Sequence, residues 1–328
     1  MPEITLKNNK TFFCSNEQTI FEAGKSNGIL LEHSCLAARC RSCKAKLLTG
    51  AVKGIHEENV LTQEEKQNGF ILTCNSIPST DVMLDIEDLD GSRLFFPKTI
   101  PSKVSSIEKL NDHVIELTLR IPPNGGLQFN PGQYVNLTIN GIKRSYSIAC
   151  NDASNNQIIF FIKHYPNGLM SNYLFNVAKA NDMLRMEGPL GSFYHRETTR
   201  KNIIFLATGT GVAPIKSILD DFEISSHKTE NREIWFFWGA RDKNDFFWNP
   251  RYKNFNLNYI PVLSRKVDDW HGDFGYVQDV VLKKEINLAD ADVYACGSET
   301  MINASLNLLK KNGLNSGHFY SDAFVMSN

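Results

Sequence analysis

The sequence contains no apolar run long enough to cross a membrane. A membrane-spanning helix needs about 20 consecutive apolar residues, and no stretch of the 328 residues approaches that length. The first residues also lack the apolar core and the small-residue cleavage site of a secretion signal. These absences favour a cytoplasmic protein without a membrane partner.

The chain also lacks an excess of charge of either sign. Its 35 basic and 36 acidic residues give a formal net charge of −1. Domains that bind nucleic acid usually carry a clear positive excess, so no nucleic-acid partner is expected. Apolar residues at 42% and charged residues at 22% are typical of a soluble globular protein.

Cysteines are few but unevenly placed. Seven occur in the chain, an odd number, and three of them lie in CLAARCRSC, residues 35–43. Without a secretion signal, such a cluster suits metal binding or redox chemistry better than a disulfide framework.

Three stretches of different pattern follow one another along the chain. Residues 1–90 predict a small unit of short strands and helices, and the turn-rich DLDGSR, residues 88–93, is the expected linker. Residues 97–198 alternate like an antiparallel β-barrel, with strands VIELTLRI, QYVNLTI, KRSYSIA and IIFFIKH and the helix LMSNYLFNVAKA. Residues 200–328 alternate apolar strands with helices such as APIKSILDDFEI and GYVQDVVLKKE, which predicts a Rossmann-like parallel sheet.

Four cysteines have the spacing of a plant-type 2Fe–2S ferredoxin. A C-x4-C-x2-C segment is followed after 30 residues by one more cysteine, which gives the metal ligands Cys35, Cys40, Cys43 and Cys74. The alternative is structural zinc, but zinc usually takes two closely spaced pairs, and here the last cysteine stands alone. Residues 1–90 therefore resemble plant-type ferredoxins, which implies a β-grasp fold.

The cysteine loop departs from that family at Ala38 and Arg41, where the family usually has glycine. Glycine permits a left-handed backbone that brings N–H groups close to the sulfur atoms, whereas a left-handed alanine costs about 1–2 kcal/mol. The loop must carry that strain or differ locally. Arg39 and Arg41 flank Cys40 at the expected exposed rim of the cluster, where positive charge would raise its potential and help to dock an acidic partner.

Two short motifs in the second stretch are weak signals alone but indicate a binding site when taken together. RSYS ends a predicted strand and GLMS opens the predicted helix. RSYS alone is equally a surface arginine beside a core tyrosine, but the two in this order resemble the flavin signature of the ferredoxin–NADP reductase superfamily. An arginine suits a pyrophosphate, and a helix N-terminus offers a second anion site, which favours FAD over FMN. The residues implied, with the Ser147 hydroxyl near flavin N5, are Arg144, Tyr146, Ser147, Gly168, Met170 and Ser171.

The third stretch opens with FLATGTGVAP, residues 205–214, which predicts a strand, a glycine turn and a helix. Proline replaces the third glycine of a G-x-G-x-x-G motif, so by itself this is equally a plain strand-to-helix turn. It does resemble the pyrophosphate loop of the same superfamily, in which glycines let a diphosphate approach the backbone and proline fits the first helical turn. The residues implied are Gly209, Thr210, Gly211 and Pro214, with Cys296 and Gly297 beside the nicotinamide.

The C-terminal segment FYSDAFVMSN resembles the part of this superfamily that covers the flavin, which implies roles for Asp322 and Phe324. The alternatives are an ordinary terminus and, for Cys296, a buried structural thiol. We expect the catalytic residues to be Ser147, Cys296 and Asp322. Acidic residues oppose a 2′-phosphate near the arginines that could read one, so NADH is expected, with NADPH possible. The residues weighed are Arg241, Arg265, Asp242, Asp245, Asp268 and Asp269.

The order of ferredoxin, FAD barrel and NAD(P)H domain is that of two groups of reductases. One serves multicomponent oxygenases and the other CDP-3,6-dideoxyhexose biosynthesis, and TINGIKRSYSIA, VYACGSETMI and FYSDAFV resemble the second group more closely. The resemblance implies an NAD(P)H-dependent oxidoreductase of O-antigen deoxysugar synthesis that passes electrons through FAD and a 2Fe–2S cluster to a pyridoxamine-phosphate-dependent dehydrase. An oxygenase acceptor is the alternative, and a zinc-stabilised binding module without electron transfer is a distant one.

Overall fold

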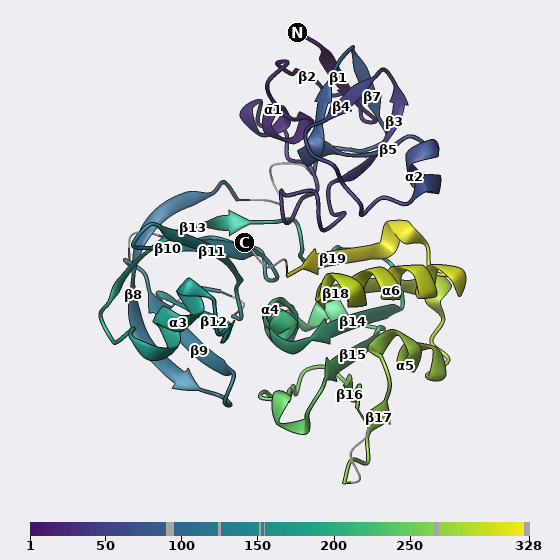
Figure 1. Ribbon diagram of the computed structural model, residues 1–328. Helices are drawn as coiled ribbons and strands as arrows, with labels where there is room; N and C mark the ends of the chain where they lie inside the picture. Colours follow the sequence, from purple (N-terminus) through teal and green to yellow (C-terminus); the bar gives the residue numbers. More distant parts are fainter. Residues whose placement is uncertain (90–94, 124–125, 151, 154, 266–268, 325–328) are drawn as a thin grey trace. The chain divides into compact units, whose positions relative to one another are not determined.

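A computed structural model describes residues 1–89, 95–123, 126–150, 152–153, 155–265 and 269–324 (Figure 1). The chain divides into two compact units, Met1–Phe95 and Phe96–Asn328. The predicted barrel and the predicted parallel sheet therefore share one unit, and the domain boundary near 198–200 stays a prediction. Within the described part of the chain, no helix is both long and apolar enough to span a bilayer.

The first unit has the predicted β-grasp architecture. A five-stranded sheet runs in the order β2-β1-β7-β3-β5, in which β1 and β7 are parallel, and β4 pairs with β6 beside it. The elements are β1 (Glu3–Leu6), β2 (Thr11–Phe13), α1 (Ile20–Ser26), β3 (Lys44–Thr49), β4 (Val52–Gly54), α2 (Gln63–Gln67), β5 (Phe70–Leu72), β6 (Ser76–Pro78) and β7 (Val82–Leu84).

Local sequence signals fix the two helices of this unit. α1 begins at a capping box in which Thr19 and Glu22 each bind the other's backbone N–H, and it ends just before the left-handed Gly28. Its apolar face lies against the sheet in one core with Ile4 and Leu6. α2 begins at a second capping box, formed by Thr62 and Glu65.

The end of this unit is tied down further than the sequence predicts. Asp88 accepts a hydrogen bond from the Leu30 N–H at 2.9 Å and pairs with Lys10 at 2.5 Å. The Leu89 N–H donates to the Leu30 carbonyl at 2.8 Å. The first two residues of the predicted linker 88–93 thus belong to the unit, and residues 90–93 lie outside the described residues.

The second unit begins with a six-stranded antiparallel barrel in the order β11-β10-β13-β8-β9-β12. Ile148, just after β11, bridges to Phe160 of β12, and the Ala149 N–H donates to Ile159 at 2.8 Å, which closes the barrel. The elements are β8 (Lys98–Lys109), β9 (Val114–Arg120), β10 (Tyr134–Ile139), β11 (Ile142–Ser147), β12 (Gln157–Lys163), α3 (Leu169–Asn176) and β13 (Met183–Leu190).

Two of these strands, β8 and β13, were not among the strands predicted from sequence. Each carries a proline, Pro101 and Pro189, and proline argues against an interior strand because it donates no hydrogen bond. β8 also has an irregular register between Val104 and Ser106. The structure uses both strands to close the barrel.

A parallel six-stranded sheet completes the unit, in the order β17-β16-β15-β14-β18-β19. α4 covers one face, and α5 and α6 cover the other (Figure 1). α6 is a helix beyond the two that the sequence indicated. The elements are β14 (Asn202–Thr208), α4 (Val212–Ile224), β15 (Glu233–Ala240), β16 (Leu257–Leu263), β17 (Asp273–Phe274), α5 (Val277–Lys283), β18 (Ala291–Gly297), α6 (Glu299–Lys311) and β19 (Phe319–Ala323).

The central strands of this sheet are buried on both faces. β14 and β18 are buried at almost every position, which explains why their sequences are continuous apolar runs rather than alternating ones. Parallel strands bring their carboxyl ends to one edge of the sheet, where ligands of such folds bind. That edge carries the predicted pyrophosphate loop and nicotinamide residues.

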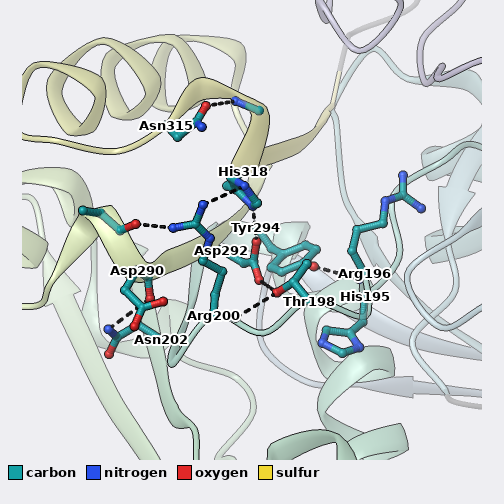
Figure 2. A network of polar contacts seen from close by, with 12 residues as sticks. His195, Arg196, Thr198, Arg200, Asn202, Asp290, Asp292, Tyr294, Asn315 and His318 are labelled. Atoms are coloured by element: carbon teal, nitrogen blue, oxygen red, sulfur yellow. Dashed lines mark hydrogen bonds and ion pairs between the residues drawn. The ribbon is translucent and has the colours of Figure 1, made fainter. Parts of the chain in front are cut away.

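A buried carboxylate fixes the chain segment that enters the parallel sheet (Figure 2). Asp292, 1% exposed on β18, accepts a hydrogen bond from Thr198 and lies 2.8 Å from Nδ1 of His318. Arg200 donates to Nε2 of the same ring at 3.0 Å, so the imidazole donates from Nδ1. The entering segment is thereby tied to β18 and to the turn before β19, the two strands that later carry site residues.

His195 in this segment makes stability depend on pH. Its ring packs edge-on against Phe222, and burial, together with Arg232 and Lys228, lowers its pKa to about 3. An unfolded histidine has a pKa of about 6.5, so below that pH the unfolded chain binds a proton that the folded chain does not. We expect the free energy of unfolding to fall as the pH drops from about 6.5 toward 3.

Denaturant titrations of the natural protein and His195→Gln over this pH range measure the effect. The variant is expected to lose stability less steeply, because other titrating groups contribute equally to both proteins. Parallel pH profiles would contradict the assignment.

Candidate functional site

The cysteine loop between α1 and β3 has a left-handed backbone at three non-glycine residues. Leu36, Ala38 and Arg41 have φ values of 50°, 55° and 65°. The loop therefore adopts the conformation that glycine favours, and it carries the strain of side chains in that conformation. In return, the N–H groups of Ala37 and Arg39 both lie 3.4 Å from Sγ of Cys35.

The four predicted ligands lie in two pairs. Sγ of Cys43 is 3.2 Å from Sγ of Cys74, and the Cys35 N–H donates to Sγ of Cys40 at 3.2 Å. Over the residues that the structure describes, no three His, Cys, Asp or Glu side chains are grouped to hold one metal ion. Paired thiols fit a 2Fe–2S cluster, which needs four thiolates over two irons, better than one tetrahedral zinc.

Each pair contains one thiol with a lowered pKa. The hydrogen bond from Cys40 lowers the pKa of Cys35 to about 6, against the opposing effect of burial. The hydrogen bond from Cys43 likewise lowers the pKa of Cys74, while the pKa values of the two donors are raised. Each pair thus holds one thiol that loses its proton more readily than an ordinary cysteine, and the remaining protons leave when metal binds.

The structure corrects the prediction that both loop arginines line an exposed rim. Arg39 is exposed, but the Arg41 side chain is only 13% exposed and pairs with Glu65. Lys44 reaches the same carboxylate at 3.0 Å. Burial acts to raise the pKa of Glu65, but hydrogen bonds and the two cations outweigh it and lower the pKa to about 2. The charge of Arg41 is therefore compensated and does not face a partner.

The motif RSYS forms the end of β11. Arg144 and Tyr146 are partly buried on the same side of the strand, because side chains alternate. Tyr146 packs against the barrel core, and burial raises its pKa, so the ring stays neutral. One guanidinium nitrogen of Arg144 donates to the Lys143 carbonyl at 2.8 Å, and an arginine has five N–H donors. A cation and an aromatic face side by side fit a flavin nucleotide.

The motif GLMS opens α3, but its side chains have other partners than the predicted phosphate. The Ser171 hydroxyl accepts from the Tyr165 N–H at 3.1 Å and donates within the same turn. Met170 is 1% exposed in the barrel core. Gly168 leaves room for that hydroxyl, since a Cβ would lie 2.6 Å from it. The groups that remain for an anion are the backbone N–H groups of the first helical turn.

The glycine turn after β14 serves two purposes. Gly209 is left-handed at φ 55°, and open space lies where its Cβ would be, which leaves access for a diphosphate. At Gly211, by contrast, a Cβ would lie 2.3 Å from the Cys296 carbonyl oxygen. Ligand approach at both glycines stays a prediction, and the structure adds a packing role for Gly211 between the turn and β18. Thr210 and Pro214 are buried in the turn and in the first turn of α4.

The end of β18 is locked to β14 in the same way. Gly297 has φ 137°, and a Cβ there would lie 2.3 Å from Oγ1 of Thr208. That same Oγ1 accepts a hydrogen bond from the Ser298 N–H at 3.2 Å. Two glycines thus let the carboxyl ends of two neighbouring strands approach more closely than side chains would permit.

The three predicted catalytic residues lie together at this edge. Cys296 pairs in register with Asp322 of β19, and the Ser147 hydroxyl lies 3.4 Å from Oδ2 of Asp322. Burial and the Asp322 carboxylate raise the pKa of Cys296, so it is a neutral thiol. The Phe324 N–H donates to the Gly297 carbonyl at 2.9 Å, and its ring packs on the sheet core.

Sequence reasoning missed the residues that hold the barrel against this edge. The Ser217 hydroxyl on α4 donates to the Cys150 carbonyl at 2.6 Å and accepts from the Gly132 N–H at 3.2 Å. Lys216 donates to the Ala149 carbonyl at 3.1 Å. These contacts fix the segment that follows Ser147. The one sequence signal available was a serine among the apolar residues of α4, and the structure buries it fully.

Known families match the chain in the order that the fold shows. Residues 4–79 match the 2Fe-2S iron-sulfur cluster binding domain. Residues 101–195 match the oxidoreductase FAD-binding domain, and residues 205–306 the oxidoreductase NAD-binding domain. The three cofactors are therefore a 2Fe–2S cluster, FAD and a nicotinamide dinucleotide, and the protein is an oxidoreductase.

Solved structures of similar fold include an Amycolatopsis cytochrome P450 reductase, with a TM-score of 0.73 at 22% identity over 99% of both chains. A ferredoxin reductase in carbazole 1,9a-dioxygenase gives 0.68 at 21% identity, over 99% of this chain and 98% of that one. At these identities the likeness shows the fold alone. It bears out the multidomain architecture of β-grasp, antiparallel barrel and parallel sheet.

Curated relatives are closer in sequence. Protein RfbI of Salmonella typhimurium is 39% identical over 98% of this chain and 95% of its own. The propane 2-monooxygenase reductase component of Rhodococcus jostii is 28% identical over 94% and 87%. CDP-6-deoxy-L-threo-D-glycero-4-hexulose-3-dehydrase reductase of Yersinia pestis is 38% identical over 96% of both chains. The chain belongs to the family of these hexulose-3-dehydrase reductases.

Proposed function

We propose that this protein passes electrons from NADH to a pyridoxamine-phosphate-dependent dehydrase that acts on a CDP-linked 6-deoxy-4-hexulose. The observation that carries the proposal is the 38% identity over 96% of both chains to a reductase named for that dehydrase. The relative is matched along all three domains, so the whole electron path is shared. The sugar itself needs no pocket in this chain, because it stays on the partner enzyme.

The residues of the site would bind and orient the cofactors. When bound, FAD takes a hydride from the dinucleotide and releases electrons singly to the cluster. Arg144 and the first turn of α3 would hold the flavin phosphates, and the turn at Gly209 the dinucleotide. Ser147 is 6% exposed and Asp322 is 4% exposed. These two residues would form a hydrogen-bonding pair beside the reacting flavin ring and would exclude water from it.

NADH is kept as the proposed donor because carboxylates, one of them exposed and one half-buried, lie near the carboxyl end of β15. Asp242 and Asp245 form the cap of a short turn there, and Lys243 is paired with Asp269. Asp268 lies outside the described residues. Arg241 and Arg265 are exposed, and a 2′-phosphate drawn to them would meet these carboxylates.

An acceptor assay tests the proposal. Protein reduced with NADH is mixed with a purified 3-dehydrase and its CDP-linked hexulose, or with an oxygenase and its substrate. Turnover with the dehydrase alone is expected. Turnover with the oxygenase alone would favour the second candidate, which rests on the 28% identity to oxygenase reductase components.

Ser147→Ala is expected to slow flavin reduction by NADH about 100-fold, the usual effect of removing one placed hydrogen-bond donor. Ser145→Ala is the matched control, because its hydroxyl lies on the same strand but is exposed and bonded to Asn136 at 2.7 Å. Stopped-flow absorbance of the flavin measures both rates. Equal rates in the two variants would remove Ser147 from the transfer site.

A further inference from the structure

Arg41 occupies an unusual place in the cysteine loop. It directly follows the ligand Cys40, and its backbone is left-handed at φ 65°, a conformation that disfavours any residue with a Cβ. Its side chain nevertheless does not extend into solvent. The guanidinium leaves the loop and donates to the Val60 carbonyl and to the Glu65 carboxylate.

The segment that receives this guanidinium is itself fixed. Glu65 accepts the Thr62 N–H of its capping box at 2.9 Å and pairs with Lys44 at 3.0 Å. The Glu58 carboxylate accepts the N–H groups of Val60 and Leu61 at 3.1 and 3.0 Å. Arg41 therefore binds a rigid support rather than a free loop.

The same segment packs against the ligands. Leu61 shares a small apolar cluster with Ala38, Cys43 and Leu72, and Val60 and Cys74 pack against it. The Lys44 N–H donates to the Arg41 carbonyl at 2.9 Å, and the Thr73 N–H to the Cys43 carbonyl at 3.0 Å. Backbone, side chain and apolar contacts thus join the loop to the short helical turn Thr73–Asn75, which carries the fourth cysteine.

We propose that Arg41 is a positioning residue for the iron–sulfur cluster. Its bonds to Val60 and Glu65 hold the loop in the left-handed geometry that brings the four thiols together, and Glu65 cancels its charge. In this chain a side-chain clamp does what glycine's freedom does in related loops. The proposal concerns the cluster and not its acceptor, so it stands apart from the proposed function.

Cluster release tests the clamp. The oxidised holoprotein is exposed to excess EDTA, and the loss of its visible absorbance is timed. Arg41→Ala, which keeps the Cβ and removes both bonds of the clamp, is expected to lose the cluster at least about tenfold faster, because even one lost charge-assisted hydrogen bond is worth about that factor. Arg41→Lys, which keeps one donor group, is expected to fall between. Arg39→Gln, the matched loss of charge on the other side of Cys40, is expected to stay within about twofold.

Arg41→Gly distinguishes the effect of the lost guanidinium bonds on cluster release from the effect of the strained backbone. It removes both the clamp and the Cβ, so it is expected to release the cluster faster than the natural protein but more slowly than Arg41→Ala. Release from Arg41→Gly at the natural rate would overturn the proposal, because strain alone would then explain the loop. Equal release from Arg41→Ala and Arg39→Gln would overturn it as well.

The cluster potential gives an independent readout. Glu65→Gln leaves Arg41 uncompensated beside the cluster, and positive charge favours the reduced state, so the midpoint potential is expected to rise. The double variant Arg41→Gln with Glu65→Gln is expected to return toward the natural potential while still releasing the cluster quickly. A potential that is the same in Glu65→Gln and the natural protein would contradict the charge balance.

Discussion

Cys74→Ser is expected to abolish cluster-dependent electron transfer while leaving flavin reduction intact. Cys74 is the predicted ligand from outside the loop, and its Sγ lies 3.2 Å from that of Cys43. Without it, Cys43 would be the only thiolate of that pair left to hold an iron. NADH-driven reduction of cytochrome c should fall at least about 100-fold, since changes even beyond the ligands can cost 10–100-fold.

The control reactions distinguish this from unfolding. NADH–ferricyanide reduction, which takes electrons from the flavin, should stay within about twofold, because the flavin and nicotinamide residues belong to the other compact unit. Cys14→Ser is the matched variant, since Cys14 is a buried thiol of the same unit that bonds to the Gln18 carbonyl and is no ligand. A visible cluster spectrum that survives in Cys74→Ser would refute the ligand set.

The second large effect is expected from Gly211→Ala. The added Cβ would lie 2.3 Å from the Cys296 carbonyl oxygen and 2.9 Å from Cα of Gly297. Both contacts are to backbone, which can yield only if the turn or the end of β18 shifts. Overpacking of this kind costs about 1–3 kcal/mol, and a displacement of about 1 Å at a reacting centre can cost 100-fold in rate. NADH–ferricyanide reduction should fall by about that factor.

Gly209→Ala is its matched control. That position has open space for a Cβ and only the cost of a left-handed alanine, about 1–2 kcal/mol. It should lower stability and raise the KM for NADH, because its Cβ would enter the space left for the diphosphate, but it should not displace the end of β18. Steady-state kinetics and thermal unfolding compare the two variants, and equal losses of kcat would show that the packing of Gly211 against Cys296 is not what matters.

Much of the fold could be predicted because its signals are local. The capping boxes, the alternating barrel strands and the buried runs of β14 and β18 follow from periodicity and turn residues. β8 and β13 could not be predicted, because their prolines argue against a strand and only the closed barrel makes them pair. The contacts of Ser217 with Gly132 and Cys150 join segments far apart in the sequence, and no local pattern records them.

The candidate site shows the same division. Spacing was enough to predict the cysteine ligands, and motif order was enough to indicate Ser147, Cys296 and Asp322 before their proximity was seen. The sequence did not allow the hydrogen-bond and packing partners of individual side chains to be predicted. Arg41 bonds to Glu65 instead of facing solvent. This contact depends on how the side chains of two segments that are 24 residues apart pack together. The close approach of Gly211 to the Cys296 carbonyl depends on how two parallel strands end.

The two glycine contacts between the ends of β14 and β18 also limit how this protein can evolve. Gly211 yields space to the main chain at Cys296, and Gly297 yields space to Thr208. A side chain gained at position 211 would meet the main chain of β18, whereas one gained at position 297 would meet the Thr208 hydroxyl. Lineages that descend from this sequence are therefore expected to keep the residues at positions 208, 211 and 297 together.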